Sequence, residues 1–163
     1  MSDANPVEFV RLAEIDAPTL SQLINNPRVQ RHMPLAQGSM SNAEIHDWVR
    51  AKESYWDDPG FGPWAFRIGG IFAGWGGLQP WNDEVEIALV LKPEFWGYGR
   101  AIFDRCLSYA FDHLHLTHVV ALLPYTRKEG RALLHLGFSL VGSAVTDNES
   151  FRVYRIDASG LQG

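Results

Sequence analysis

The segment from Glu84 to His115 constrains the fold most, because a strand pattern changes there into a helix pattern across two closely spaced glycines. Aliphatic and β-branched residues up to Pro93 predict a strand, which the proline closes. Gly97 and Gly99 follow, and apolar residues then recur at helical spacing. The segment therefore predicts a strand, a glycine-rich turn and a long helix in immediate succession.

The turn is a candidate anion site. A glycine-rich turn that opens a helix presents backbone N–H groups at the positive end of the helix dipole, and glycine lets the backbone approach a phosphate closely. A pyrophosphate would fit there, and a strand-to-helix turn without any ligand explains the same residues equally well. The turn lacks the Gly-Lys-Ser/Thr of the P-loop and the third glycine of the dinucleotide fingerprint, so neither of those nucleotide loops is predicted.

The rest of the chain alternates predicted strands and helices, with hairpins beside crossover connections. Gly69 and Gly70 predict a tight hairpin turn, and Ser41 with Glu44 predicts a capping box at a helix start. The predicted order is β-α-α-β-β-β-α-β-α-β-β, which favours a mixed sheet with helices on both faces. The expected strands are 6–12, 64–68, 71–78, 84–93, 118–124, 139–145 and 150–156. The expected helices are 15–27, 99–115, 127–138 and one that begins at the capping box of residue 41. The length predicts one domain over residues 1–163.

Composition excludes several classes of protein. A single cysteine, Cys106, rules out an internal disulfide and a four-cysteine zinc site, and it is compatible with a reducing compartment. The net charge of -5 argues against nonspecific nucleic-acid binding. We find no signal-peptide pattern and no apolar run that would cross a membrane, so we expect a cytoplasmic protein. His113, His115 and His118 lack the spacing of a helical zinc site, and we expect a solvated helix end and no metal.

The strand and turn resemble the acetyl-coenzyme A motif of the GNAT N-acetyltransferase superfamily, in the branch of the ribosomal-protein N-terminal (Rim-type) acetyltransferases. In that branch a strand E-I-G-Y-x-[LV]-x-P leads into [YF]-W-G-x-G-x-[AG]. Residues 86–93 and 95–101 match this pattern here. Residues 10–34 resemble the branch's opening strand and helix, and residues 126–138 resemble its late segment, so the likeness spans nearly the whole chain.

The resemblance implies a mixed α/β fold, with a mostly antiparallel sheet of about seven strands and about four flanking helices. It implies acetyl-CoA as cosubstrate and acetyl transfer to a primary amine of a protein N-terminus, an amino acid or a small amine, by direct attack. The resemblance is also compatible with a homodimer. The residues that the resemblance assigns to the coenzyme are Leu89, Val90, Leu91, Trp96, Gly97, Tyr98, Gly99, Arg100, Ala101 and Thr126. Thr126 replaces the family's usual Asn, and Glu129 replaces its usual Ser.

Glu86 is the candidate general base, acting directly or through water, because it lies on the strand that leads to the turn. The alternative is a solvated glutamate on a half-exposed strand, where Glu84 shares its face. We expect one or two tryptophans to line an acceptor cleft and the others to pack in the core. The candidates for both roles are Trp48, Trp56, Trp64, Trp75 and Trp81.

Three functions remain open at this level. The leading one is an acetyl-CoA-dependent N-acetyltransferase. The second is a noncatalytic acyl-CoA-binding sensor or regulatory module. This alternative stays open because Thr126 and Glu129 replace the family's usual Asn and Ser. The third is an interaction domain that has lost the coenzyme.

Overall fold

The strands form one seven-stranded sheet in a computed structural model that describes residues 6–30, 39–125 and 130–159. The strand order is β1-β2-β3-β4-β5-β7-β6, and every neighbouring pair is antiparallel except β4 and β5. The mixed, mostly antiparallel sheet expected from the sequence is confirmed. The strands are β1 (Val7–Arg11), β2 (Pro63–Ile68), β3 (Ile71–Trp81), β4 (Glu84–Leu91), β5 (His118–Pro124), β6 (Ser139–Thr146) and β7 (Glu149–Asp157).

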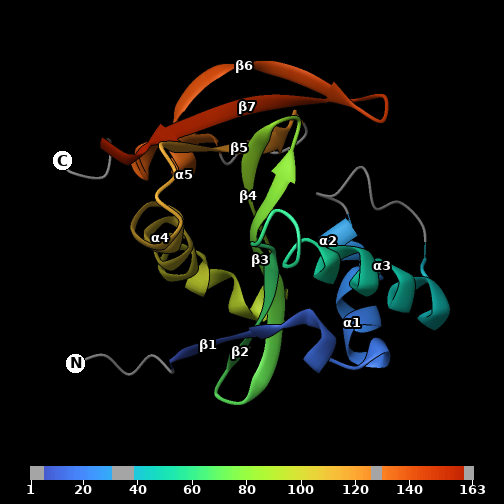
Figure 1. Cartoon of the computed structure of the whole chain (residues 1–163). Helices are drawn as coiled ribbons and strands as arrows, with labels where there is room; N and C mark the ends of the chain where they lie inside the picture. The colour runs from blue at the N-terminus through green and yellow to red at the C-terminus, as the bar shows by residue number, and fades with distance from the viewer. Residues whose placement is uncertain (1–5, 31–38, 126–129, 160–163) are drawn as a thin grey trace.

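Helices cover both faces of the sheet, with α1 to α3 on one side and α4 on the other (Figure 1). The α-helices are α1 (Ala17–Ile24), α2 (Pro27–Gln30), α3 (Asn42–Ser54), α4 (Gly99–Ser108) and α5 (Gly130–His135). The predicted capping box forms at α3, where the Ser41 hydroxyl accepts from the Glu44 N–H and the Glu44 carboxylate accepts from the Ser41 N–H. The short α2 was not predicted, because the sequence pattern ended the first helix at Pro27.

Two hydrophobic cores flank the sheet. Ile87 and Leu91 of β4 pack with α4, whereas Val90 packs on the opposite face against the core beneath α1 and α3. Side chains alternate between the faces of a strand. Glu84 and Glu86 therefore lie on the same face as Val90, toward α3.

The sheet opens between β4 and β5. Within the described residues these strands share a single in-register pair, Glu86 with Val120. By contrast, β4 pairs with β3 along its whole length, and β5 does so with β7. Figure 1 shows β5 and the β6–β7 hairpin crossing over one end of β4. Beyond Glu86, β4 thus has an edge without a neighbouring strand.

The predicted turn and helix differ in detail from the sequence expectation. Residues Pro93–Tyr98 form a 3-10 helix, η3, that leads directly into α4. Proline suits the first position of a helical turn, and the pattern did not distinguish this short helix from an open turn. The helix predicted to run to residue 115 ends as an α-helix at Ser108 and continues as one π-helical turn, η4 (Tyr109–His113).

Candidate active site

Trp96 fixes the glycine-containing turn to the strand that precedes it. Its indole N–H donates to the carbonyl of Leu91, the last residue of β4, at 3.0 Å. The indole is still about half exposed, and the guanidinium carbon of Arg28 lies 5.1 Å from its ring centroid. Trp96 therefore sets the position of the turn and presents an aromatic surface beside it, with a cation from α2 nearby.

The fold itself does not require glycine at positions 97 and 99. A Cβ added to Gly97 would meet nothing within 4 Å, and one added to Gly99 would lie 3.6 Å from a Leu89 methyl carbon, an ordinary contact. By contrast, a Cβ on Gly76 would lie 2.4 Å from the Ala88 carbonyl oxygen. Neither Gly97 nor Gly99 has a positive φ. Open space over the turn suits a bound group that approaches the backbone closely, so the turn fits a coenzyme pyrophosphate.

The N–H groups of the turn are only partly free. The Gly99 N–H donates to the Trp96 carbonyl, which corrects the expectation that this amide is available to a ligand. Arg100 and Ala101 lie in the first turn of α4, where N–H groups have no acceptor within their own helix. The Arg100 side chain is exposed, with its Nε 3.8 Å from an oxygen of Asp104. The first-turn amides of α4 are therefore the better donor candidates.

The open edge of β4 presents alternate residues. The Lys92 N–H donates to the Ala73 carbonyl of β3 at 2.8 Å. Since backbone groups of an antiparallel strand point alternately to either side, those of Val90 also face β3, and those of Leu89 and Leu91 face away from it. The Leu91 carbonyl is already bound by Trp96. Of the three strand residues that the resemblance assigns to the coenzyme, Leu89 has the backbone groups best placed at the gap.

Glu86 lies at the point where β4 leaves β5, with its side chain largely shielded from water. One carboxylate oxygen accepts from Nε2 of Gln79, its cross-strand neighbour, at 3.2 Å. Burial raises the pKa of Glu86, while the hydrogen bond from Gln79 and the charge of Lys52 oppose that rise. A carboxylate with a raised pKa is suited to accept a proton near neutral pH. The Glu86 side chain is thus partly buried and hydrogen-bonded, on a strand whose residues are mostly half-buried.

Sequence reasoning missed Lys52 and Gln79. The Lys52 ammonium donates to Oε1 of Gln79 at 2.8 Å. Burial lowers the pKa of Lys52, and the charge of Glu86 opposes that change. Two signals were present in the sequence. Lys52 follows Trp48 by four residues and so shares its helix face, and Gln79 lies opposite Glu86 in the hairpin register.

Two of the five candidate tryptophans, Trp48 and Trp75, lie beside Lys52. The rings of Trp48 and Trp75 meet edge to face at 5.0 Å, and the Lys52 ammonium lies 5.9 and 5.4 Å from their centroids. Trp56 and Trp64 instead contact each other, at 5.3 Å between centroids. The indole N–H of Trp75 is buried without a partner in the described part of the chain. Trp75 is buried in the core beneath α3, and Trp48 packs partly exposed against the same core.

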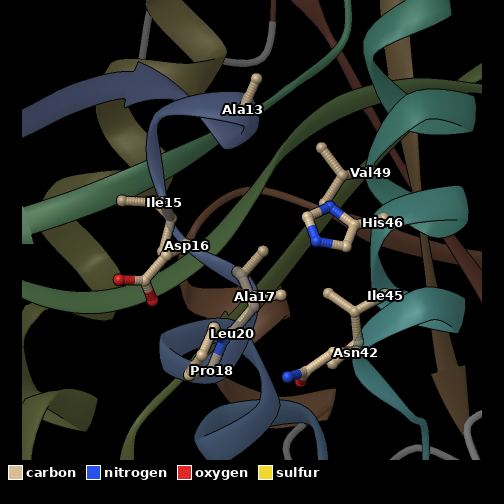
Figure 2. A pocket seen from close by; sticks show the side chains of 10 residues that line it. All are labelled: Ala13, Ile15, Asp16, Ala17, Pro18, Leu20, Asn42, Ile45, His46 and Val49. Carbon is tan, nitrogen blue, oxygen red and sulfur yellow. The ribbon is translucent and has the colours of Figure 1, made fainter.

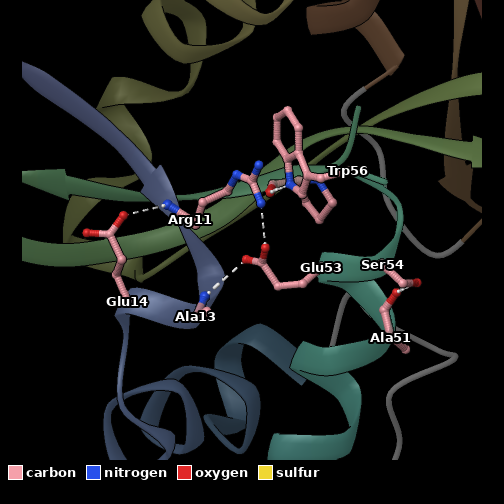
Figure 3. A network of polar contacts seen from close by, with 8 residues as sticks. Arg11, Ala13, Glu14, Ala51, Glu53, Ser54 and Trp56 are labelled. Atoms are coloured by element: carbon pink, nitrogen blue, oxygen red, sulfur yellow. Dashed lines mark hydrogen bonds and ion pairs between the residues drawn. The ribbon is translucent and has the colours of Figure 1, made fainter. Parts of the chain in front are cut away.

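An ion pair fixes α3 and with it Lys52. Glu53 accepts from the Arg11 guanidinium at 2.7 Å and from the Ala13 N–H at 3.1 Å, and the Arg11 guanidinium also covers the Trp56 ring (Figure 3). These contacts attach the last turns of α3 to the first strand. Lys52 follows the fully buried Ile45 by seven residues, so it lies on the face of α3 that packs toward the sheet.

A hollow separate from these residues lies between α1 and α3. Its volume is about 360 Å³, and Ile15, Leu20 and Ile45 contribute apolar walls (Figure 2). Asp16 and His46 are its ionisable lining residues. Neither the glycine turn nor Glu86 lines this hollow, so it is separate from the candidate active site.

The remaining sequence candidates fall in different places. His118 is on β5 rather than at a helix end, and its Nε2 lies 2.6 Å from a carboxylate oxygen of Glu84. No cluster of His, Cys, Asp and Glu suited to a metal occurs among the described residues. Burial raises the pKa of Cys106 to about 12, so its thiol stays protonated at neutral pH. Thr126 and Glu129 lie outside the described residues.

A family model described as an acetyltransferase (GNAT) domain matches residues 7–139. The chain belongs to the GNAT acetyltransferase family. This GNAT domain is accordingly an acyltransferase, and GNAT enzymes use acetyl-CoA as cosubstrate. No curated protein sequence matches the chain significantly. Within the described residues, none of the helices combines the length and the hydropathy needed to span a membrane.

Solved structures share the fold of this GNAT domain. A GNAT-family acetyltransferase from Bacillus anthracis aligns with a TM-score of 0.75 and 17% identity, over 95% of this chain and 96% of that one. An acetyltransferase described as putative, from T. thermophilus, aligns with a TM-score of 0.73 and 19% identity, over 100% of this chain and 93% of that one. A mutant spermidine N-acetyltransferase from Vibrio cholerae aligns with a TM-score of 0.71 and 17% identity, over 95% of each chain.

The raised pKa of Glu86 predicts a pH-dependent stability difference. A folded-state pKa above the ordinary value of 4.5 contributes stability that is complete below that value and is lost as the pH rises through the folded pKa. Glu86→Gln removes this loss. The unfolding free energy of the variant, relative to the wild type, should therefore rise from about pH 4 to about pH 8 in urea titrations. If the difference in unfolding free energy between variant and wild type stayed constant across this pH range, the pKa of Glu86 would not be raised in the folded protein.

Proposed function

We propose that this GNAT domain transfers the acetyl group of acetyl-CoA to a primary amine by direct attack. One observation carries the proposal. The shielded carboxylate of Glu86 lies where β4 leaves β5, on the strand that leads to the open glycine turn. A base, a gap in the sheet and an anion-compatible turn are thus placed in sequence along one segment.

The coenzyme would lie along the turn and the open edge of β4. The open space over Gly97 and Gly99 and the first-turn amides of Arg100 and Ala101 suit its pyrophosphate. The backbone of Leu89, facing the gap, suits its acyl arm. Acetyl-CoA, when bound, supplies an activated thioester. The family resemblance adds Leu91, Trp96, Tyr98 and Thr126 to this binding surface. It also names Val90, whose backbone groups face β3 instead.

Glu86 would prepare the amine for attack. An amine is largely protonated at neutral pH and must lose a proton before its nitrogen can form the new amide bond. Glu86 accepts that proton, directly or through one water, while the thiolate departs as the carbon–sulfur bond breaks. Backbone N–H groups at the strand gap suit the negative charge that develops on the acyl oxygen.

We propose a primary amine as the acceptor, and we place the chain in the Rim-type branch, which acts on protein N-termini. The partly exposed ring of Trp48, which packs against Trp75, favours an acceptor with an apolar or planar group beside its amine. The structural neighbours include a spermidine N-acetyltransferase, so polyamines belong in the same comparison.

Calorimetry with acetyl-CoA and thiol release with a panel of amines test this function. The panel contains N-terminal peptides, amino acids, polyamines and aromatic amines. We expect binding and turnover with at least one class. Binding without turnover across the panel would favour a noncatalytic acyl-CoA sensor, and no binding would favour an interaction domain.

A further inference from the structure

Three side chains from three elements form a continuous polar chain. Lys52 of α3 donates to Oε1 of Gln79 on β3 at 2.8 Å, and Nε2 of Gln79 donates to Glu86 on β4 at 3.2 Å. A side-chain amide has one acceptor end and one donor end. Because an ammonium can only donate and a carboxylate can only accept, this arrangement permits one orientation of the Gln79 amide. Lys52 thereby determines which end of Gln79 faces Glu86.

The surroundings of Lys52 are unusual for a surface lysine. Its ammonium lies between 5.4 and 5.9 Å from the ring centroids of Trp48, Tyr55 and Trp75. Arg50, two residues earlier on the same helix, is mostly exposed and pairs with Asp47, which is also exposed. The helix thus carries one cation toward solvent and one toward the sheet. Burying a charge is costly unless it is paired, and the partner of Lys52 here is the Gln79–Glu86 pair.

We infer that Lys52 is a positioning residue for the proposed acetyl transfer, acting through the Gln79 amide to orient the Glu86 carboxylate and keep it ionised. The inference rests on the role proposed for Glu86. Lys52 neither receives the proton nor contacts the acyl group. It fixes the geometry of the base and supplies the positive charge that favours its ionised form.

The charged groups around Glu86 are few in the described part of the chain. Lys52 faces it from α3, and Gln79 faces it from β3 without a charge. Glu84 shares its strand face, and it is hydrogen-bonded to His118 of β5. Burial raises the pKa of Glu86, and Lys52 is the group whose charge lowers it. Removing Lys52 should therefore make Glu86 retain its proton to a higher pH.

The test compares Lys52→Met with the wild type across pH. At each pH, the kcat/KM of the variant is divided by that of the wild type with the best amine from the panel, so that the ionisation of the amine itself cancels. We expect the ratio to fall about tenfold at pH 6 and to recover toward pH 9. The KM for acetyl-CoA should stay unchanged, because Lys52 does not line the glycine turn.

Two controls separate this effect from a general change in charge or packing. Arg50→Met removes a cation from the same helix and should leave the ratio near one at every pH. Lys52→Arg keeps the charge and should restore most of the activity at pH 6. Methionine matches the apolar stem of lysine, so Lys52→Met should fold, and thermal unfolding checks this.

The outcomes distinguish the inference from the proposed function. Suppose that Glu86→Gln abolishes turnover and that the kcat/KM ratio of Lys52→Met to wild type is constant with pH. Glu86 would then act without Lys52, and the inference would be overturned. Normal turnover in Glu86→Gln would instead overturn the proposed base itself. Gln79→Met removes the side-chain amide that links Lys52 to Glu86 but keeps Lys52 itself. We expect this variant to lower kcat at every pH. An unchanged kcat in that variant would contradict the positioning role.

Discussion

Replacing Gly99 with valine is expected to abolish measurable acetyl-CoA binding while the chain remains folded. The φ of Gly99 is -56°, which valine adopts readily, and a Cβ there makes only an ordinary contact with Leu89. Removing a glycine also reduces the conformational freedom of the unfolded chain, which contributes about 0.4–1 kcal/mol of stability. The added methyl groups would occupy the space over the turn that the pyrophosphate needs. Calorimetry should show an affinity loss of at least about 100-fold, with an unchanged or higher melting temperature.

Gly142 provides the matched control for this variant. It lies on β6, far along the sheet order from the turn, and a Cβ there would meet nothing within 4 Å. Gly142→Val should therefore leave acetyl-CoA affinity unchanged. If folded Gly99→Val bound acetyl-CoA as well as this control does, the coenzyme would not lie on the turn.

Glu86→Gln is expected to reduce turnover by about 10²–10⁴-fold with little change in acetyl-CoA affinity, the range typical for loss of a positioned base. Glutamine retains the size of the side chain but cannot accept a proton. The loss should become smaller at high pH, where more of the amine is already neutral. Steady-state rates across pH, together with calorimetry, measure both effects.

Glu84→Gln is the matched control, because Glu84 lies two residues earlier on the same strand face and is hydrogen-bonded to His118. We expect its turnover to stay within a few-fold of the wild type. Near-normal turnover in Glu86→Gln would assign Glu86 a structural role. A joint fall of acetyl-CoA affinity and melting temperature would mean that Glu86 holds the strand in place rather than moving a proton.

Local patterns in the sequence predicted much of the framework around the site. The glycine pair at 69 and 70 has positive φ values of 61° and 80° in the hairpin turn, as that turn requires. The capping box of Ser41 and Glu44 marks the start of α3. Both signals depend on interactions between residues close in the chain, so the sequence contains all the information they need.

The polar chain behind Glu86 depends on tertiary contacts. Lys52 and Gln79 are 27 residues apart, and their hydrogen bond requires a specific rotation of α3 against the sheet. The Arg11–Glu53 ion pair, which also joins α3 to the rest of the fold, links residues separated by 42 positions. The sequence also does not show which N–H groups of the turn are already hydrogen-bonded, because the glycine pattern does not distinguish an open turn from a 3-10 helix.

The single in-register pair between β4 and β5 makes the sheet behave as two ladders, one of four strands and one of three. Glu86 is one half of that pair, so the candidate base stands where the two ladders separate. Burial already raises the pKa of this carboxyl. A molecule that fills the gap beside it displaces further water, and that loss of hydration raises the affinity of Glu86 for a proton.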